Sequence, residues 1–308
     1  MNNTGKSPSR RTLLALGAGA ALAASLPAGG GAFAASGSGS GAVARRLAEL
    51  ERDHSARLGV YARDTATGRT VAYRAQERFP LCSVFKTLAV AAVLRDLDRD
   101  GEFLAKRVRY TAQETTASGH APITGLPENL ARGMTIGELS DATIRFSDNA
   151  AANLLLRELG GPAAVTRFAR STGDTSTRLD RWEPELNSAE PGRVTDTTTP
   201  YAIGRTYERL TLGTALGAAD RRRLTGWLLG NTTGGERLRA GLPGGWTVAD
   251  KTGAGSYGTN NDVAIAWPPG RAPLVIAVLT TKPDPGAAPD NPLIARTAAL
   301  LAAALTGN

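Results

Sequence analysis

The chain has 308 residues, of which 42% are hydrophobic and 21% are charged, so it is not a disordered chain and can form one large domain or two intermingled ones. Its formal net charge is +8, but the basic residues form neither a Lys/Arg block nor a basic stripe interleaved with aromatic residues. Binding to nucleic acid is therefore not expected.

The N-terminal segment has the features of an export signal. Residues 9–14 (SRRTLL) match the twin-arginine pattern, an apolar run continues to Leu26, and residues 32–34 (AFA) form a cleavage signal. The apolar run is shorter than the ~20 residues that a membrane span needs. We expect a twin-arginine signal peptide over residues 1–34, a linker over 35–41, and a secreted or periplasmic protein without a stable membrane anchor.

The next part of the chain predicts a helix, two strands and a second helix. A helical pattern covers residues 42–57, and strand-like runs cover residues 58–63 and 70–74 with turn-forming residues between them. The second helix is predicted over residues 83–100, where apolar residues recur on one face and Gly101 ends the pattern.

Ser83 and Lys86 lie at the start of this second helix. Residues three apart share one face of a helix, so the Lys86 amine can reach the Ser83 hydroxyl, and the start of a helix favours an anion. Only five of the 36 basic residues are Lys, and a desolvated lysine can lose its proton whereas an arginine cannot. Alone, however, S-x-x-K is also the pattern of an ordinary helix start. The single cysteine, Cys82, is expected to be a buried small hydrophobic residue rather than a nucleophile.

The middle of the chain is predicted to be mostly helical. Thr135 and Glu138 form a capping box at one helix start. Further helices cover residues 149–159 and the segment after Pro162. Residues 173–199 show no periodicity, and so long an irregular segment inside a domain is usually functional.

The last third of the chain returns to strands. Short apolar runs at 246–251, 262–267 and 273–281 are separated by Gly, Pro and Asn, and a closing helix starts near residue 291. Strands at both ends of the chain with helices between them predict an α/β (α+β) fold, in which a sheet layer built from both termini carries an inserted helical layer. A pocket is expected at the seam between these layers.

Metal and histidine chemistry are both disfavoured. His54 and His120 are the only histidines, and neither has a carboxylate or cysteine at metal-ligand spacing, so no metal or other cofactor is expected. No G-x-S-x-G motif is present, so a nucleophile in this chain needs a base other than histidine.

Three short motifs follow one another along the chain. They are S-x-x-K at 83–86, S-D-N at 147–149, and K-T-G at 251–253, where a predicted strand ends. Each motif alone is commonplace, but the set resembles the penicillin-recognising serine enzymes.

The irregular segment distinguishes one class within that superfamily. Residues 178–187 (RLDRWEPELN) resemble the Ω loop of class A β-lactamases, in which a carboxylate, here Glu183, and an amide, here Asn187, hold one water. The chain is thus similar to class A serine β-lactamases of the actinobacterial type over nearly all of its length after the signal. The resemblance implies a five-stranded antiparallel sheet flanked by helices, with an α/β domain at 42–80 and 230–308, a helical domain at 81–229, and the Ω loop at 178–196.

The resemblance implies a double displacement on a β-lactam, the expected small-molecule partner of a monomeric enzyme. Ser83 attacks the lactam carbonyl, and the backbone N–H groups of Ser83 and Ala254 hold the oxyanion. Lys86, or Glu183 acting through water, takes the serine proton. Ser147 passes a proton to the leaving nitrogen, and Glu183 then activates the water that hydrolyses the acyl-enzyme. The implied catalytic residues are Ser83, Lys86, Ser147, Glu183, Asn187 and Ala254.

The resemblance also implies how a substrate is bound. Asn260 stands where some members of the family have an arginine, and Arg237 looks like its substitute. His120 stands where the family has an aromatic gate, and Arg181 and Asp196 match an ion pair that holds the Ω loop. The implied substrate-binding residues are His120, Asn149, Arg237, Lys251, Thr252 and Gly253.

Two other functions remain open alternatives. A DD-peptidase or penicillin-binding protein shares the serine, lysine and K-T-G elements but lacks the Ω-loop glutamate. A non-catalytic β-lactam-binding receptor would be expected to lose Lys86 or Glu183, and both are present. One carbapenem-hydrolysing group has a disulfide between the positions of Cys82 and Gly255. The glycine at 255 excludes this disulfide here, which disfavours hydrolysis of carbapenems.

Overall fold

A computed structural model of the protein describes residues 39–307. The predicted signal peptide (1–34) and residues 35–38 of the predicted linker lie outside the described residues. Within the described range, no helix is long and apolar enough to cross a membrane.

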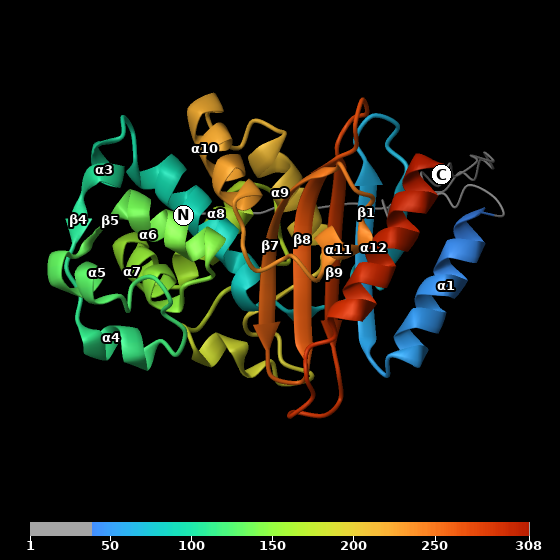
Figure 1. Cartoon of the computed structure of the whole chain (residues 1–308), viewed down its shortest axis with the longest axis horizontal. Helices are drawn as coiled ribbons and strands as arrows, with labels where there is room; N and C mark the ends of the chain where they lie inside the picture. Colours follow the sequence, from blue (N-terminus) through green and yellow to red (C-terminus); the bar gives the residue numbers. More distant parts are fainter. Residues whose placement is uncertain (1–38, 308) are drawn as a thin grey trace, which may run out of the picture. The chain divides into compact units, whose positions relative to one another are not determined.

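One five-stranded antiparallel sheet, in the order β2-β1-β9-β8-β7, organises the described part of the chain (Figure 1). The first strand pairs with the last along its whole length, with Arg57 opposite Thr281 and Asp64 opposite Leu274. The sheet is therefore built from both ends of the chain, which confirms the predicted fold class. Its strands are β1 (Arg57–Asp64), β2 (Thr70–Tyr73), β7 (Thr247–Gly255), β8 (Thr259–Trp267) and β9 (Leu274–Thr281).

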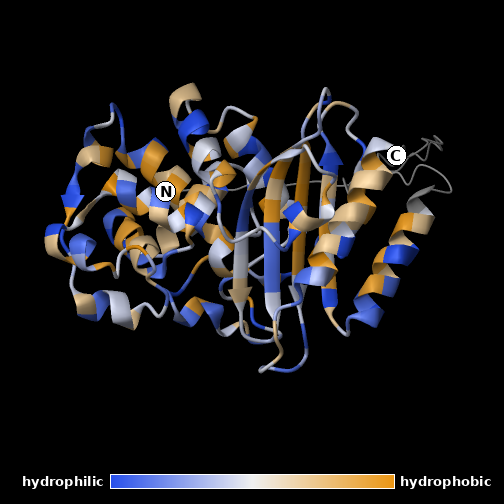
Figure 2. Cartoon of the chain, viewed as in Figure 1, coloured by the Kyte–Doolittle hydropathy of each residue, from blue (hydrophilic) through white to orange (hydrophobic). Residues whose placement is uncertain are grey.

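Alternate residues of a strand point to opposite faces, so the two faces of the sheet pack against different layers. On β1, Leu58, Val60 and Ala62 belong to a hydrophobic cluster shared with the outer helices, whereas Tyr61 belongs to the cluster of the inner, helical layer. Figure 2 shows hydrophobic residues along β9 and along the upper part of β8, whereas β7 is more hydrophilic. The outer helices are α1 (Gly39–Asp53), α11 (Leu238–Gly241) and α12 (Asn291–Thr306).

The helical layer covers the other face of the sheet (Figure 1). Within it, every residue of the helix that carries Lys86 is buried. A helix buried on all sides must be apolar all round unless a polar residue has a specific partner, so Lys86 needs one. The elements of this layer are η1 (Cys82–Phe85), α2 (Lys86–Ala92), η2 (Val93–Leu97), α3 (Glu102–Ala105), α4 (Ala112–Ala117), α5 (Pro127–Arg132), α6 (Ile136–Arg145), α7 (Asn149–Leu159), α8 (Ala163–Ser171), η3 (Glu185–Ser188), α9 (Pro200–Thr211) and α10 (Ala218–Leu229).

Two short strand pairs connect loops to this framework. Strand β3 (Phe79–Pro80) pairs with β6 (Thr197–Thr198), so the end of the irregular segment is tied to the residues just before Ser83. Strand β4 (Arg107–Val108) pairs with β5 (Met134–Thr135) at the far end of the helical layer. The first pair matters for the site, because it places the Ω loop next to η1.

The predicted end of the second helix is wrong. The helix expected over 83–100 ends at Leu97, because Asp98 has an extended backbone and its carboxylate accepts a hydrogen bond from the N–H of Leu104. Gly101 therefore precedes α3 rather than ending the earlier helix.

The predicted position of the K-T-G motif on its strand is also wrong. Residues 251–253 lie inside β7, which continues to Gly255, opposite Thr259 of β8. Thr and Gly side chains give a weak strand pattern, but the backbone hydrogen bonds to β8 keep these residues extended. The motif is thus held between β8 on one side and η1, which carries Ser83, on the other.

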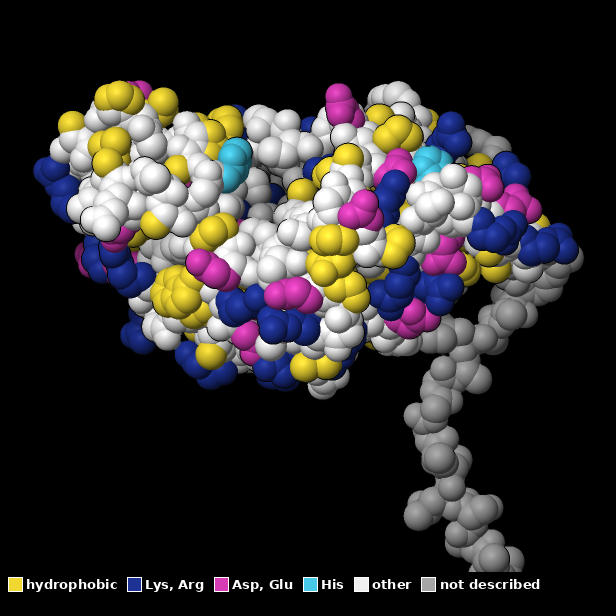
Figure 3. Space-filling model, turned by 90° about the horizontal axis from the view of Figure 1, so that it is seen from below, with side chains coloured by type: hydrophobic (Ala, Val, Ile, Leu, Met, Phe, Trp, Pro, Cys, Tyr) yellow, Lys and Arg dark blue, Asp and Glu magenta, His cyan; other side chains and the backbone are white. Residues whose placement is uncertain are grey.

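Charged side chains of both signs are intermixed on the surface. On the face drawn in Figure 3, Lys and Arg lie beside Asp and Glu rather than gathering in one basic area. Pairs such as Arg132 with Glu138 and Arg157 with Glu114 are largely exposed. Exposed pairs contribute at most about 1 kcal/mol each, so the fold depends on its two apolar clusters instead.

Candidate active site

Ser83 lies on η1, directly after β3. The Asn261 side chain donates hydrogen bonds to the backbone carbonyls of Pro80 (2.9 Å) and Leu81 (3.3 Å), which fixes the approach to the serine. Cys82 has a positive φ of 43°, an uncommon backbone conformation that persists where the surroundings enforce it. Cys82 is buried, which confirms the prediction. Burial raises the pKa of its thiol, which disfavours a thiolate nucleophile.

The Lys86 amine lies at the centre of the site. Its Nζ atom lies 2.6 Å from Oδ1 of Asn149, 2.8 Å from the backbone carbonyl of Ser147, and 3.0 Å from Oε1 of Glu183. The Ser83 hydroxyl donates to the same Glu183 oxygen at 3.4 Å. Burial lowers the pKa of Lys86, and the adjacent Glu183 carboxylate opposes this shift. The amine is therefore closer to releasing a proton than that of an exposed lysine.

Ser147 connects the two buried lysines. It lies between α6 and α7 with a φ of 56°, and its Oγ accepts from Lys251 at 3.0 Å and from Lys86 at 3.4 Å. The neighbouring Asp148 caps α7 and accepts from the hydroxyl of Thr124 at 2.8 Å, which fixes the turn. A hydroxyl held by two amines in this way can pass on a proton and be resupplied with one.

Amide side chains hold Glu183. Asn187 donates to its Oε2, and Asn153 on α7 both donates to its backbone carbonyl (2.8 Å) and accepts from its N–H (3.0 Å). The Oδ1 atom of Asn187 is buried and has no hydrogen-bond partner among the described residues. A buried polar atom without a partner is costly, so this oxygen marks a place for a hydrogen-bond donor beside the carboxylate.

The Ω loop is anchored at its base by Arg181 and Asp196. Their side chains are 2.5 Å apart, and the other Asp196 oxygen accepts from the backbone N–H groups of Asp180 and Arg181. The backbone carbonyl of Asp196 accepts from the N–H of Leu81 at 2.8 Å. The base of the loop is thus bound to the segment that carries Ser83.

Strand β7 passes against the backbone of Ser83. A Cβ atom at Gly253 would lie 3.1 Å from the Ser83 nitrogen and 3.2 Å from Cβ of Cys82, so the close approach of the two segments leaves little room for a side chain. Ala254 follows directly on the same strand, opposite Asn260. The strand therefore brings Ala254 into the neighbourhood of the Ser83 N–H group.

Lys251 and Thr252 lie side by side and are both buried. The Lys251 amine donates to the backbone carbonyl of Thr252 at 3.0 Å, and the Thr252 hydroxyl lies 2.5 Å from that of Thr233. Burial lowers the pKa of Lys251 well below its ordinary value, and the charges of Lys86 and Arg237 lower it further. A bound anion would oppose this shift and stabilise the charged amine.

Arg237 lies against the backbone of two strands. Its guanidinium donates to the carbonyls of Gly253 (3.1 Å) and Asn261 (2.9 Å) and to the side-chain oxygen of Asn291 (3.2 Å). The Asn260 side chain donates to the same Asn291 oxygen at 3.1 Å. Arg237 thus places a positive charge beside the K-T-G segment.

His120 and Asn149 lie together on the other side of the site. The backbone N–H of Asn149 donates to the carbonyl of His120 at 2.7 Å, and the Asn149 amide donates to the carbonyl of Ser118 at 3.0 Å. The His120 ring is exposed, with Nε2 3.3 Å from the carbonyl of Phe146. Asn149 is therefore an inner residue of the site and His120 an outer one.

The side chains brought together here are a hydroxyl, two amines, a carboxylate and amides. Among residues 39–307, no group of three or more His, Cys, Asp or Glu side chains could hold a metal ion. This arrangement suits nucleophilic catalysis, in which the serine forms a covalent bond and lysine or glutamate moves protons.

Comparisons with known proteins agree with this chemistry. The β-lactamase enzyme family matches residues 42–305. The chain belongs to this family. A β-lactamase of Streptomyces lavendulae is 68% identical over 305 residues, covering 99% of this chain and 100% of the relative.

Two further relatives place the chain within the family. The solved structure of the β-lactamase from Streptomyces albus G is 67% identical with a TM-score of 0.84, covering 85% of this chain and 98% of that one. A carbapenem-hydrolyzing β-lactamase KPC of Klebsiella oxytoca is 52% identical over 243 residues, which are 79% of this chain and 82% of the relative. The predicted class A serine β-lactamase of the actinobacterial type is confirmed.

The sequence reasoning missed three asparagines of this β-lactamase family member. Asn153 could have been found, because it lies four residues after Asn149 on a predicted helix and so shares its face. Asn261 and Asn291 hold the approach to Ser83 and the Arg237 guanidinium. No local pattern marks these two, because their partners are distant in sequence.

Gly255 lies next to Cys82, at the position from which the disulfide of one carbapenem-hydrolysing group would form. A Cβ atom at Gly255 would lie 2.8 Å from the Cys82 sulfur. With a glycine at this position, the thiol of Cys82 is free.

Proposed function

We propose that the protein hydrolyses the amide bond of β-lactams such as penicillins and cephalosporins through an acyl-enzyme on Ser83. One observation carries the proposal: the Ser83 hydroxyl and the Lys86 amine lie 3.4 and 3.0 Å from the same oxygen of Glu183. A nucleophile, a buried amine and a carboxylate that meet at one point can serve both acylation and deacylation. The relatives named β-lactamase support the same activity.

In the acylation step, the Ser83 oxygen attacks the lactam carbonyl carbon, and its proton passes to Lys86 or through a water to Glu183. Both bases remain open, because both contact the reacting region. The backbone N–H groups of Ser83 and Ala254 hold the oxyanion, and one such donor typically contributes about 3–4 kcal/mol. As the C–N bond breaks, Ser147 gives its proton to the ring nitrogen and recovers one from an adjacent lysine.

In the deacylation step, a water between Glu183 and Asn187 attacks the ester carbonyl. Glu183 takes a proton from the water, the bond between the carbonyl carbon and Ser83 Oγ breaks, and Glu183 returns the proton to Oγ. The product is the ring-opened acid. The buried Asn187 Oδ1, which has no partner among the described residues, supports this placement of the water.

Substrate binding is proposed to rely on cations and amides. Lys251, Thr252 and Arg237 bind the substrate carboxylate, and Gly253 lets the strand approach the lactam. Asn149 binds the side-chain amide of the substrate, and His120 forms the outer rim in place of an aromatic residue.

The Arg237→Ala variant is expected to raise KM for carboxylate-bearing β-lactams about tenfold, with a smaller change in kcat. The reason is the loss of a charge-assisted contact to a group that does not take part in bond breaking. Steady-state kinetics with benzylpenicillin measure the effect, and Arg237→Lys should recover part of the affinity. Unchanged kinetic constants in Arg237→Ala would mean that another cation binds the carboxylate.

Multiple turnovers of a β-lactam test the proposed function directly. Wild-type protein should hydrolyse many equivalents of nitrocefin and benzylpenicillin, measured by absorbance, whereas Ser83→Ala should hydrolyse neither. A DD-peptidase or a non-catalytic receptor would instead bind about one equivalent of penicillin and stop. Either of these outcomes would replace the proposed activity.

We also infer how the protein is organised and exported. The N-terminal sequence pattern supports a twin-arginine signal over 1–34. This signal would direct the enzyme out of the cytoplasm, to the side of the membrane on which β-lactams are encountered. The strand pairing supports division of the mature chain into an α/β part (42–80 and 230–308) and a helical part (81–229). We propose a monomer as the active form.

A further inference from the structure

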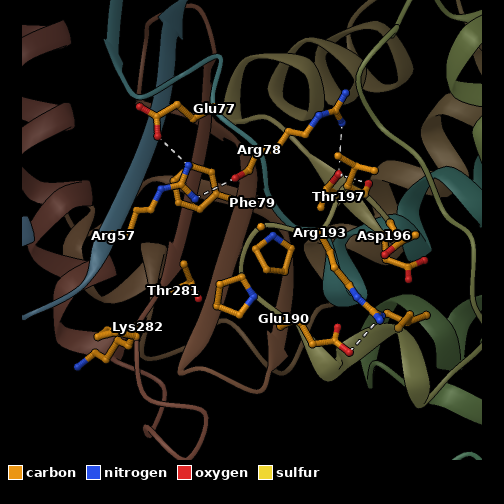
Figure 4. Close-up of a pocket in the computed structure, with 18 of the residues that line it drawn as sticks. Arg57, Glu77, Arg78, Phe79, Glu190, Arg193, Asp196, Thr197, Thr281 and Lys282 are labelled. Carbon is orange, nitrogen blue, oxygen red and sulfur yellow. Dashed lines mark hydrogen bonds and ion pairs between the residues drawn. The ribbon is translucent and has the colours of Figure 1, made fainter.

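A cavity of about 850 Å³ lies behind the Ω loop, away from the catalytic side chains (Figure 4). One wall is the returning half of the loop, Leu186 and residues 189–197. The other walls are residues 55–57, residues 77–80, and residues 281–283. The volume is within the range of small-ligand sites. We call it the Ω-loop cavity.

The inner surface of the Ω-loop cavity is largely apolar. Phe79 and Leu186 line it but are already buried; the lining residues that keep accessible apolar surface include Ala56, Pro80, Pro191 and Pro283. Such a surface gains free energy when an apolar group covers it.

Val194 adds an apolar side chain that is still exposed. It lines the same cavity, yet 51% of it is exposed, which is unusual for a large hydrophobic residue of this chain. An apolar ligand in the cavity would cover this side chain together with the lining prolines.

Most of the cations around the cavity already have partners. Arg57 pairs with Glu77 and stacks over Phe79 at 4.0 Å. Arg78 donates to oxygens of Ser176 and Thr197, and in Figure 4 it points away from the middle of the cavity. Arg181 pairs with Asp196, and Lys282 pairs with Asp290.

Arg193 is the least compensated of the lining cations. Its side chain is 54% exposed and pairs with Glu190 at 3.2 Å. Glu190, however, also lies 3.5 Å from Arg181 and accepts from the Ser188 hydroxyl at 2.6 Å. One carboxylate is therefore shared between two arginines, so the Arg193 guanidinium can still bind a second acid group.

We propose that the Ω-loop cavity binds a small monocarboxylate with an apolar body. The apolar body would rest on Pro80, Pro191 and Val194, which line the cavity and are not buried, and the carboxylate would accept hydrogen bonds from Arg193. A doubly charged ligand is disfavoured, because Glu190 and other carboxylates of the lining would repel the second charge. The site is separate from β-lactam hydrolysis, so it goes beyond the proposed function.

Calorimetric titration with 4-phenylbutyrate tests the proposal. Acetate, which lacks the apolar body, and 4-phenylbutanol, which lacks the charge, serve as matched probes, and both should bind more weakly. Arg193→Gln should weaken 4-phenylbutyrate binding about fivefold, as expected for one partly exposed ion pair, and Arg193→Lys should recover part of it. Val194→Ser should weaken binding of the acid and of the alcohol alike.

Two arginine variants serve as controls. Arg46→Gln removes an exposed, paired arginine on α1, and Arg237→Gln removes the cation assigned to β-lactam binding; neither should change binding of 4-phenylbutyrate. Loss of binding in Arg237→Gln but not in Arg193→Gln would place the ligand at the catalytic site and overturn the proposal. Absence of saturable binding at millimolar concentration, or equal affinity for the acid and the alcohol, would also overturn it. None of these measurements depends on turnover, so failure here leaves the proposed function untouched.

Discussion

The Glu183→Ala variant should accept a penicillin and then fail to release it. Lys86 and Ser147 remain to assist acylation, but the base that activates the second water is gone. General bases of this kind typically contribute about 10²–10⁴-fold, so kcat should fall by a factor in that range. Intact-protein mass spectrometry should show a lasting adduct of the mass of the penicillin on Ser83.

Glu185 offers a matched control on the same loop. It is also a glutamate, but it is exposed at the start of η3 and not in the buried cluster. Glu185→Ala should therefore turn over penicillin at the wild-type rate and show no adduct. Fast turnover by Glu183→Ala, or an equal loss in both variants, would contradict the role assigned to Glu183.

The Lys86→Ala variant should fail one step earlier. The substitution removes the amine next to both the Ser83 hydroxyl and Ser147, so the acyl bond to Ser83 forms slowly. The second-order rate of acylation should fall by about 10³-fold or more, and no adduct should appear on the time scale that loads Glu183→Ala. Quenched-flow mass spectrometry of the two variants separates the steps.

Removing Lys86 also affects stability, because the Glu183 carboxylate stays buried without its cation. Breaking one partner of a buried ion pair typically costs about 3–5 kcal/mol. Thermal unfolding should therefore show a lower stability for Lys86→Ala than for the wild type. The double variant Lys86→Ala/Glu183→Ala should recover part of that stability, whereas acylation stays slow in both variants. Lys106→Ala, which removes a partly exposed lysine on the surface, is the control. Wild-type acylation by folded Lys86→Ala would exclude a role for the amine.

Much of the fold followed from local patterns. Helix α7 matches the predicted range 149–159, and the capping box of Thr135 and Glu138 is present, because both depend on residues close in sequence. The strand pattern at both ends of the chain likewise indicated one shared sheet. The early end of the helix at Leu97 could not be predicted, because it depends on a side-chain bond from Asp98 to the next helix.

The candidate site was predictable where the chemistry lies in short motifs. S-x-x-K, S-D-N, K-T-G and the Ω loop indicated the residues that the structure brings together. The motifs could not indicate which other side chains hold the motif residues in position. Asn261 and Asn291 act on segments far away in sequence, and Asn260, which stands where some members of the family have an arginine, donates to Asn291.

The pairing of β1 with β9 has a consequence for how the protein is made. The ribosome delivers β1 early, but its partner strand is finished only at Thr281, near the end of synthesis. Until then, β1 lacks the strand that pairs along its whole length, and apolar residues of β1 stay uncovered. Sheets closed by such distant segments fold slowly, so we expect a nascent chain stopped before β9 to be inactive and prone to aggregate although it already contains Ser83, Lys86 and Glu183.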